Sequence, residues 1–445
     1  MAGGTWTTQN KVRPGVYIRF KSAAGLGLTV GDRGKVAICE PLSWGPVGQV
    51  MTVELGADTT PFIGYDLTNT KAMFLREIFK GTNRTSAPNT VYLYRPSADS
   101  SVQASATIAP LTVKALYPGV RGNDISIVIT EDADTEGQFT VNTVVDGSIV
   151  DSQIAKTVGD LVNNSWVDFS GTGNLASTAG TTLTGGEDGT VQSAAYSAFL
   201  SVIEAYDFDT LIYDGDDSVV LTAMQSFVKR LADDNGQYCQ LVAANVTNPD
   251  SRFVINVSSG VTLDDGTVLT PQQTCWWVGG AEAGAKYNES LTYASYPGAV
   301  DASPVRTNNQ VIASLNAGQL VLFAENSVVK VEQDINSLVT YTPDIGKVYR
   351  KNRVMRLCNT IANDVYEQFS QNFVGVVNNN TDGRMRFKSA IVGYLLELQD
   401  AQAIQNFETD DVEVLPGAEI DAIIVNVAIQ AVDSVEKVYM TVTVG

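Results

Sequence analysis

Residues 213–217, Tyr-Asp-Gly-Asp-Asp, carry the carboxylates best placed for chemistry in this chain. Asp214, Asp216 and Asp217 follow directly after a predicted strand, and open α/β sheets often bind ligands at the carboxyl ends of their strands. Three converging carboxylates could hold Mg²⁺ or Ca²⁺. The same residues also fit a turn and a helix N-cap, because acidic side chains favour the first turn of a helix. We favour the cap, and we expect no metal site.

Other signals of catalysis are weak. The chain has no histidine, which removes the commonest general base and all imidazole metal ligands. The four cysteines lie far apart in the sequence, each beside apolar residues, so we expect reduced, buried thiols. We therefore predict no catalytic residue and no cofactor, and an enzyme is the less favoured class.

The charge of the chain is unevenly distributed. The net charge is −20 over 445 residues, and a strongly acidic protein is a poor partner for nucleic acid. Residues 346–388 are the exception, with 8 basic and 3 acidic side chains, a net charge of +5. No apolar run approaches the roughly 20 residues that span a bilayer, and the first residues lack the features of a signal peptide. We expect neither nucleic-acid binding nor direct membrane insertion.

The basic segment is predicted to begin a helix. Apolar residues recur at three- and four-residue spacing from Val354 to Phe369, which is typical of an amphipathic helix. Its first part carries the basic residues Lys347, Arg350, Lys351, Arg353 and Arg356. Two interpretations remain open: a solvated helix face, or a docking face for an acidic protein surface.

The elements that position these residues alternate in type. Strands are predicted at 35–39, 91–95, 209–213 and 240–244, with helices between them, which is the pattern of an α/β domain. Residues 99–189 differ, because they are rich in Ser, Thr, Gly and Val and poor in helix formers. Asp146-Gly147 lies between two alternating runs, the favoured two-residue hairpin turn. We predict an all-β module inserted into an α/β middle domain.

Both ends of the chain predict strands that lie outside the main sheet. Residues 420–432 and 435–444 alternate apolar and polar side chains with the period of two that is typical of strands. A long apolar strand without a basic or proline-containing end is prone to pair with another chain. About twelve polar residues precede a short predicted strand near Arg13–Phe20. The pattern indicates either strand exchange between subunits or a strand that closes its own sheet.

Four stretches together resemble one family, the contractile tail sheath proteins of bacteriophages and related prophage particles. They are Arg13-Pro-Gly-Val-Tyr-Ile18, Leu183-Thr-Gly-Gly-Glu-Asp-Gly189, the helix 353–361 and the strand 436–444. Their order and spacing extend over almost the whole chain, and the inserted segment matches least.

The resemblance implies a structural subunit, not an enzyme, that polymerises helically around a tail tube and contracts to drive the tube through a bacterial envelope. It implies a conserved α+β tube-facing domain from residues 1–20 and 346–445, an α/β middle domain from 21–98 and 190–345, and a β-rich outer domain from 99–189. The implied partners are further copies of this chain, a tail tube protein, and baseplate and tail-terminator proteins. The implied location is a virion tail assembled in the host bacterial cytoplasm.

Two sets of residues are then candidates for contacts. The strands exchanged between subunits would contain Val16, Tyr17, Ile18, Val438, Tyr439, Met440, Thr441, Val442 and Val444. The tube would be contacted by Lys347, Arg350, Lys351, Arg353 and Arg356. Two other classes remain alternatives. An acidic α/β metal-dependent enzyme would need the three aspartates to converge, and a secreted self-assembling surface-layer protein would need an export route.

Overall fold

A computed structural model describes residues 2–4, 15–17 and 28–444. The chain divides into two compact units, which are described separately. Unit 1 comprises residues 1–30 and 364–430, and unit 2 comprises residues 31–363 and 431–445. The chain is mixed α/β and multidomain, as its sequence predicts.

A seven-stranded sheet forms the centre of unit 2. Its strand order is β19-β15-β14-β13-β3-β5-β4, and only the edge strand β4 is antiparallel to its neighbour. The strands are β3 (Lys35–Cys39), β4 (Val50–Glu54), β5 (Thr90–Tyr94), β13 (Thr210–Tyr213), β14 (Gln240–Ala244), β15 (Val254–Val257) and β19 (Gln319–Leu320). All five residues of β14 are buried, as expected for a parallel strand that is covered on both faces.

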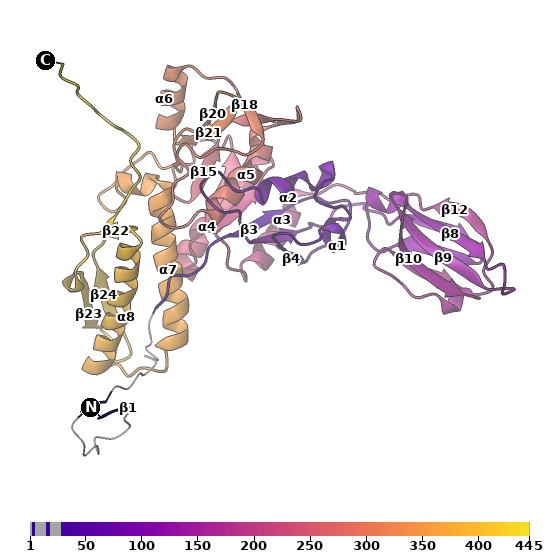
Figure 1. Cartoon of the computed structure of the whole chain (residues 1–445), viewed down its shortest axis with the longest axis horizontal. Coiled ribbons are helices and arrows are strands. Elements are labelled where there is room, and N and C mark those ends of the chain that lie inside the picture. Colours follow the sequence, from indigo (N-terminus) through magenta and orange to yellow (C-terminus); the bar gives the residue numbers. More distant parts are fainter. Residues whose placement is uncertain (1, 5–14, 18–27, 445) are drawn as a thin grey trace. The chain divides into compact units, whose positions relative to one another are not determined.

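Each face of this sheet has its own apolar core. Val36 and Ile38 of β3 belong to a core with α2 (Met73–Ile78) and α5 (Pro271–Gly284). The alternate residues Ala37 and Cys39 belong to a second core with α3 (Ser193–Ile203) and α4 (Ser218–Arg230). Successive side chains of a strand point to opposite faces, so this alternation places helices on both sides of the sheet (Figure 1).

Helix α5 is buried along most of its length. It begins with Thr270 as N-cap in a capping box and Pro271 in the first turn. Two glycines let the helix approach its neighbours closely. A Cβ on Gly279 would lie 2.4 Å from the side chain of Ile212, and one on Gly280 would lie 2.0 Å from the carbonyl oxygen of Ile78. The helix is therefore wedged between the sheet and α2.

The rest of this part of unit 2 consists of short elements. They are α1 (Thr60–Ile63), β16 (Gly260–Leu263), β17 (Val268–Leu269), β18 (Ala299–Ser303), α6 (Asn308–Asn316), β20 (Leu322–Glu325) and β21 (Val328–Val331). Strands β16 and β17 pair antiparallel.

Residues 99–188 form two antiparallel sheets around a separate apolar core (Figure 1). One sheet contains β8 (Ile125–Glu131), β9 (Phe139–Val145), β10 (Ser148–Ala155) and β12 (Thr178–Thr182), and the other contains β6 (Ser105–Ile108), β7 (Leu111–Ala115) and β11 (Val167–Gly171). Asp146 and Gly147 connect β9 to β10 with φ angles of 50° and 77°. Positive φ at both central residues is the requirement of a tight type I′ turn, so the predicted all-β module and its hairpin are confirmed.

Unit 1 is built on a pair of helices and a β-hairpin. Helix α7 (Asn352–Asn372) enters unit 1 at residue 364, and α8 (Thr381–Asp400) follows it. Phe369, Phe373 and Phe387 pack ring against ring between the two helices. Strand β23 (Val412–Pro416) pairs antiparallel with β24 (Ile423–Val427). The remaining strands described here are β1 (Ala2–Gly4), β2 (Gly15–Tyr17), β22 (Ile404–Gln405) and β25 (Gln430–Ala431).

The structure corrects two of the predicted elements. The second predicted strand, 435–444, is not formed, since the described residues from 432 to 444 contain no strand. A strand needs a hydrogen-bonding neighbour, and this segment has the alternating pattern without one in the described chain. The basic segment is not one helix either. A 3₁₀ turn covers Lys347–Arg350, and α7 begins only at Asn352.

Candidate functional site

The segment 438–444 exposes nearly all of its apolar surface. Its exposed fractions are 79% for Val438, 90% for Tyr439, 79% for Met440, 71% for Val442 and 89% for Val444, and Thr441 is exposed as well. Apolar side chains with period-two spacing and unpaired backbone form a template for pairing with another chain. The candidate strand residues of this segment are therefore accessible.

The N-terminal candidates are described only in part. Val16 and Tyr17 lie in β2, which pairs in parallel with β1. Ile18 lies outside the described residues. Their role in strand exchange stays a prediction.

Glu436 attaches the base of the exposed segment to unit 2. Its carboxylate accepts hydrogen bonds from Thr292 Oγ1 at 2.8 Å and Gln333 Nε2 at 2.7 Å, and it pairs with Lys351. Burial raises the pKa of Glu436, but the hydrogen bonds from Lys351, Gln333 and Thr292 outweigh it and hold the pKa below its usual value. Asp433 lies 3.8 Å from the same lysine ammonium.

The basic candidates for a tube contact lie in different environments. Lys347 is exposed, whereas Arg350, Lys351 and Arg353 are partly buried. Arg350 donates to the carbonyl oxygen of Leu315, and Lys351 is paired with Glu436. Burial lowers the pKa of Arg353. The sequence groups these residues as one basic face, but the fold leaves Lys347 as the most accessible of them.

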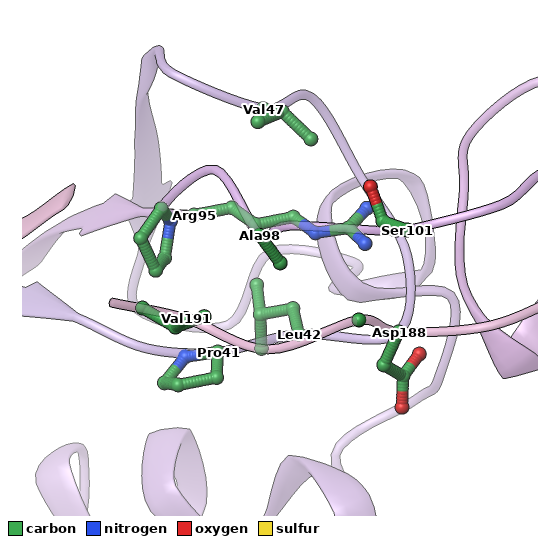
Figure 2. Close-up of a pocket in the computed structure, with 10 residues that line it drawn as sticks. Pro41, Leu42, Val47, Arg95, Ala98, Ser101, Asp188 and Val191 are labelled. Carbon is green, nitrogen blue, oxygen red and sulfur yellow. The ribbon is translucent and has the colours of Figure 1, made fainter.

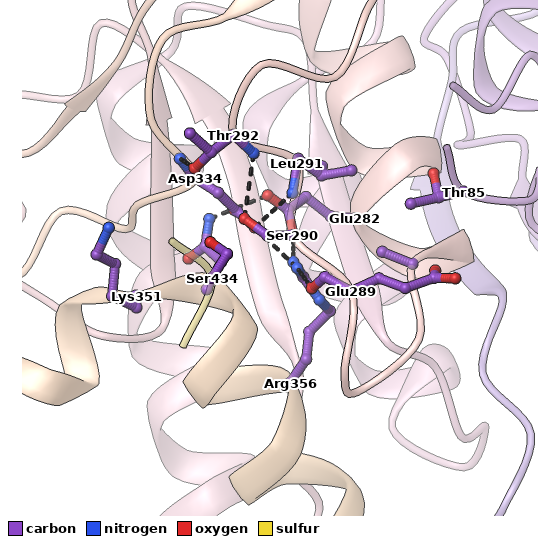
Figure 3. Close-up of polar contacts among 12 residues, drawn as sticks. Thr85, Glu282, Glu289, Ser290, Leu291, Thr292, Asp334, Lys351, Arg356 and Ser434 are labelled. Carbon is purple, nitrogen blue, oxygen red and sulfur yellow. Dashed lines mark hydrogen bonds and ion pairs between the residues drawn. The ribbon is translucent and has the colours of Figure 1, made fainter. Parts of the chain in front are cut away.

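Arg356 corrects the predicted tube-contact set, because it is fully buried. Its guanidinium pairs with Glu282 of α5 and, at 2.8 Å, with Asp334, and it donates to the carbonyl oxygen of Glu289 at 2.6 Å. Asn352 Nδ2 donates to Glu282 at 3.0 Å. Figure 3 shows Arg356 pointing from α7 toward these carboxylates. The periodicity of apolar residues in this helix could not predict the burial of Arg356. A buried charge needs oppositely charged partners, and those of Arg356 lie far away in the sequence.

The buried cluster has two carboxylates and one guanidinium. Burial, and then the charge of Asp334, raise the pKa of Glu282 well above its usual value. Burial also disfavours the ionised form of Asp334, but the charge of Arg356 outweighs this effect and lowers its pKa. The single arginine therefore favours the ionised form of Asp334, whereas burial favours the neutral form of Glu282. The cluster links α5, the loop at residue 334 and the start of α7, and so stabilises unit 2.

Asp214 and Asp217 of the acidic stretch 214–217 accept hydrogen bonds from different partners. Asp217 caps α4 by accepting a hydrogen bond from the Val219 amide at 2.8 Å, which confirms the cap interpretation. Asp214 accepts from Trp276 Nε1 at 2.8 Å. Burial and the nearby Asp214 raise the pKa of Glu40, at the end of β3, well above its usual value. Among the residues that the structure describes, no group of three or more His, Cys, Asp or Glu side chains could hold a metal ion.

The junction between the sheet and the β-sandwich is closely packed. Arg95 donates to the carbonyl oxygens of Gly45 at 2.8 Å and Pro118 at 2.7 Å, and burial lowers its pKa to about 10. Asp188 accepts from the Val120 amide at 2.8 Å and from Ser43 Oγ at 3.0 Å. The cavity between them holds only ≈ 70 Å³ (Figure 2), far less than the roughly 300 Å³ of a small-molecule site. This cavity is too small for such a ligand, and the contacts around it connect the two domains.

Comparison with known proteins identifies the class. Family profiles of the phage tail sheath protein match in three parts: the β-sandwich domain at residues 99–188, the central domain at 189–337 and the C-terminal domain at 344–445. In the part of the chain that is described, no helix is both long and apolar enough to span a membrane. The fold, with its inserted β-sandwich, agrees with this class.

Whole-chain relatives support the same assignment. The chain is 42% identical to the sheath tail protein from Desulfitobacterium hafniense, with a TM-score of 0.86 over 96% of this chain and 99% of that one. It is 34% identical to the phage-like element PBSX protein XkdK of Bacillus subtilis over the full length of both chains. The contracted helical sheath of the anti-feeding prophage shares the fold, with a TM-score of 0.58 and 16% identity over 97% of this chain and 99% of that one. This chain belongs to the phage tail sheath family, a family of structural tail components.

In the sequence we did not identify the partners of the buried Arg356, nor Glu436, which attaches the segment 438–444 to unit 2. Glu282 has a recognisable signal, since it is the one carboxylate in the apolar helix Pro271–Gly284, and a lone charge on a buried helix needs a partner. Asp334 and Glu436 lie in loops without such a pattern, and only the fold brings them to Arg356 and Lys351.

Proposed function

We propose that this chain is the structural subunit of a contractile tail sheath that polymerises helically around a tail tube. In this proposal the sheath contracts and drives the tube through a bacterial envelope, as part of a virion tail assembled in the host cytoplasm. The chain acts without catalysis or cofactor, and its partners are further copies of itself, a tube protein, and baseplate and tail-terminator proteins. The observation that carries the proposal is the exposed, strand-patterned segment 438–444 in a chain of the sheath family.

Strand exchange explains why that segment has no neighbour in its own chain. A second copy can supply a sheet edge, to which each added strand residue contributes backbone hydrogen bonds. The apolar surface that becomes buried stabilises the pairing by about 25 cal/mol per Å². Strand β24 of unit 1 is one available edge, since it pairs only with β23 in its two-stranded sheet among the described residues. The exchanged terminal segments then act as tethers that keep the subunits connected while the sheath contracts.

The tube contact is proposed for the exposed part of the basic segment. Lys347 is the first candidate and Arg350, Lys351 and Arg353 are secondary candidates, while the burial of Arg356 removes it from the set. Exposed ion pairs contribute only about 0–1 kcal/mol each. Weak contacts of this kind can be released during contraction, yet they add up over many subunits.

Electron microscopy of the full-length chain beside a variant lacking residues 438–445 tests the proposal. We expect tubes or rings from the full-length chain, alone or co-expressed with a tube protein, and dispersed particles from the truncated chain. Because residues 438–444 are exposed, the truncated chain should keep its folding free energy within about 0.5 kcal/mol. Normal tubes from the truncated chain would overturn strand exchange through this segment.

The tube contact has a separate test. Lys347→Glu should weaken the assembly of an extended sheath around the tube without preventing self-assembly of sheath subunits. Lys330 lies on β21 and is paired with Glu325 of β20, and Lys330→Glu is the control for charge reversal on the same unit. Equal sheath assembly around the tube in both variants would remove the basic segment as a tube contact.

A further inference from the structure

The segment 433–437 is held to unit 2 almost entirely by polar contacts. The side chain of Glu436 is 12% exposed, whereas its apolar neighbours Val435 and Val438 are 86% and 79% exposed. Apolar burial therefore contributes little to the free energy that keeps this stretch in place. The contacts of Glu436 provide most of it.

The partners of Glu436 come from three separate parts of the chain. Thr292 and Gln333 donate hydrogen bonds from two loops, and Lys351 supplies the charge from the residue just before α7. Hydrogen bonds to a charged group contribute more to stability than those between neutral groups. The site is specific, because one carboxylate satisfies three donors at once.

The same contacts are connected to the buried cluster beneath them. Thr292 Oγ1 donates to Glu436 and also accepts a hydrogen bond from the Asp334 amide at 2.9 Å. The side chain of Asp334 pairs in turn with Arg356. Figure 3 shows Thr292, Asp334 and Arg356 in this arrangement. Glu436 is therefore connected through Thr292 to the buried charge cluster of Asp334 and Arg356.

We propose that Glu436, with Lys351 and Thr292, forms an anchor that fixes the base of the C-terminal arm, which comprises residues 433–444. Glu436 is the positioning residue of this anchor. Residues 433–436 stay on the body of their own subunit, and residues 438–444 are the part that pairs with a second copy. The inference rests on the proposed function, in which that second copy receives the strand. The anchor sets the point at which the strand leaves the body, and so limits which sheet edges it can reach.

Tryptic cleavage after Lys437 measures the anchor in the unassembled, full-length chain. A protease needs several residues on both sides of the cleaved bond in an extended, detached conformation. Lys351→Ala leaves the sequence around Lys437 unchanged but removes the cation that pairs with Glu436. We expect release of the peptide 438–445, followed by mass spectrometry, to become roughly tenfold faster in this variant.

Two further variants distinguish an anchor from a general loss of stability. Lys351→Arg keeps the positive charge and should keep cleavage as slow as in the unmodified chain. Lys347→Ala removes an exposed lysine from the same segment and should leave the rate unchanged. Equal cleavage rates for Lys351→Ala and the unmodified chain would overturn the anchor, as would equal acceleration by Lys347→Ala.

Assembly then tests whether the anchor positions the strand. By electron microscopy, Lys351→Ala should give fewer and less regular tubes, and Lys351→Arg should restore them. Faster cleavage with tubes as regular as those of the unmodified chain would overturn the positioning role. The cleavage result does not depend on assembly, so failure of the anchor and failure of the sheath proposal remain distinguishable.

Discussion

Strand β14 and the segment 438–444 have similar apolar character but opposite environments. All five residues of β14 are buried, with β13 and β15 as parallel neighbours, whereas the apolar residues of 438–444 are 71–90% exposed. The two segments differ in their hydrogen-bonding edges. Both edges of β14 are paired within its own chain, and the described part of this chain pairs neither edge of 438–444. A strand pattern thus predicts what a segment can form, and the available edges decide where it forms.

The charged residues near the start of α7 differ in the same way. Arg356 is buried between two carboxylates of its own unit, while Lys347, nine residues earlier, is exposed. Buried ion pairs contribute specificity and are costly to break, whereas exposed charges are free to take part in weak contacts. Unit 2 therefore combines a rigid interior with a periphery whose contacts are still available.

One substitution made in both strand-patterned segments tests this comparison with the largest expected effect. Val242→Asp places a carboxylate in the buried centre of β14 and should cost at least about 4 kcal/mol or prevent folding. Val442→Asp makes the same change at an exposed site and should alter the folding free energy by no more than about 0.5 kcal/mol. Urea unfolding of both variants measures the difference. A large loss of stability from Val442→Asp would show that 438–444 packs on its own chain.

Removal of the buried arginine should have the next largest effect. Arg356→Leu leaves Glu282 and Asp334 buried without a cation, which should cost roughly 3–5 kcal/mol at pH 7. The loss should shrink toward pH 5, because a buried carboxylate that has lost its cation can bind a proton there and so lose its uncompensated charge. Chemical unfolding at both pH values measures this. Arg353→Leu, one turn earlier and only partly buried, is the control and should cost less than about 1 kcal/mol; equal losses would contradict the role assigned to the cluster.

Glu40 and Asp214, which follow the ends of β3 and β13, should have a smaller, pH-dependent effect on the free energy of unfolding. Burial and the charge of Asp214 raise the pKa of Glu40, so folding favours its protonated form. The stabilisation is complete below the unfolded pKa and is lost as the pH rises toward the folded pKa. Glu40→Gln should therefore be more stable than the unmodified chain at pH 8, by about 1–3 kcal/mol, and similar to it at pH 4.5. Thermal unfolding across this range measures the slope, and the exposed Glu54→Gln should leave it unchanged.

Local sequence patterns predict much of this fold but little of its polar interior. Periodicity locates β3, β13 and β14, and Thr270-Pro271 marks the start of α5, because these signals lie within a few residues of each other. The pairing of Arg356 with Glu282 joins residues 74 positions apart, and nothing in the local pattern of α7 distinguishes it from a solvated basic residue. The strand predicted at 435–444 is absent for a related reason, since strand formation depends on an edge that the sequence does not specify.

The smallest predicted effect concerns the acidic stretch from which a metal site could be imagined. Asp217 caps α4, so Asp217→Ala should cost about 1 kcal/mol. Asp216, exposed and one residue earlier, should tolerate the same substitution within about 0.5 kcal/mol. Thermal unfolding of both variants, with and without Mg²⁺ or Ca²⁺, measures the two roles together. Neither cation should change the midpoint of either variant or of the unmodified chain, because Asp214 is engaged by Trp276 and Asp217 by the helix. A cation-dependent midpoint that Asp216→Ala abolishes would restore the metal-site interpretation and contradict the cap as the reason for these carboxylates.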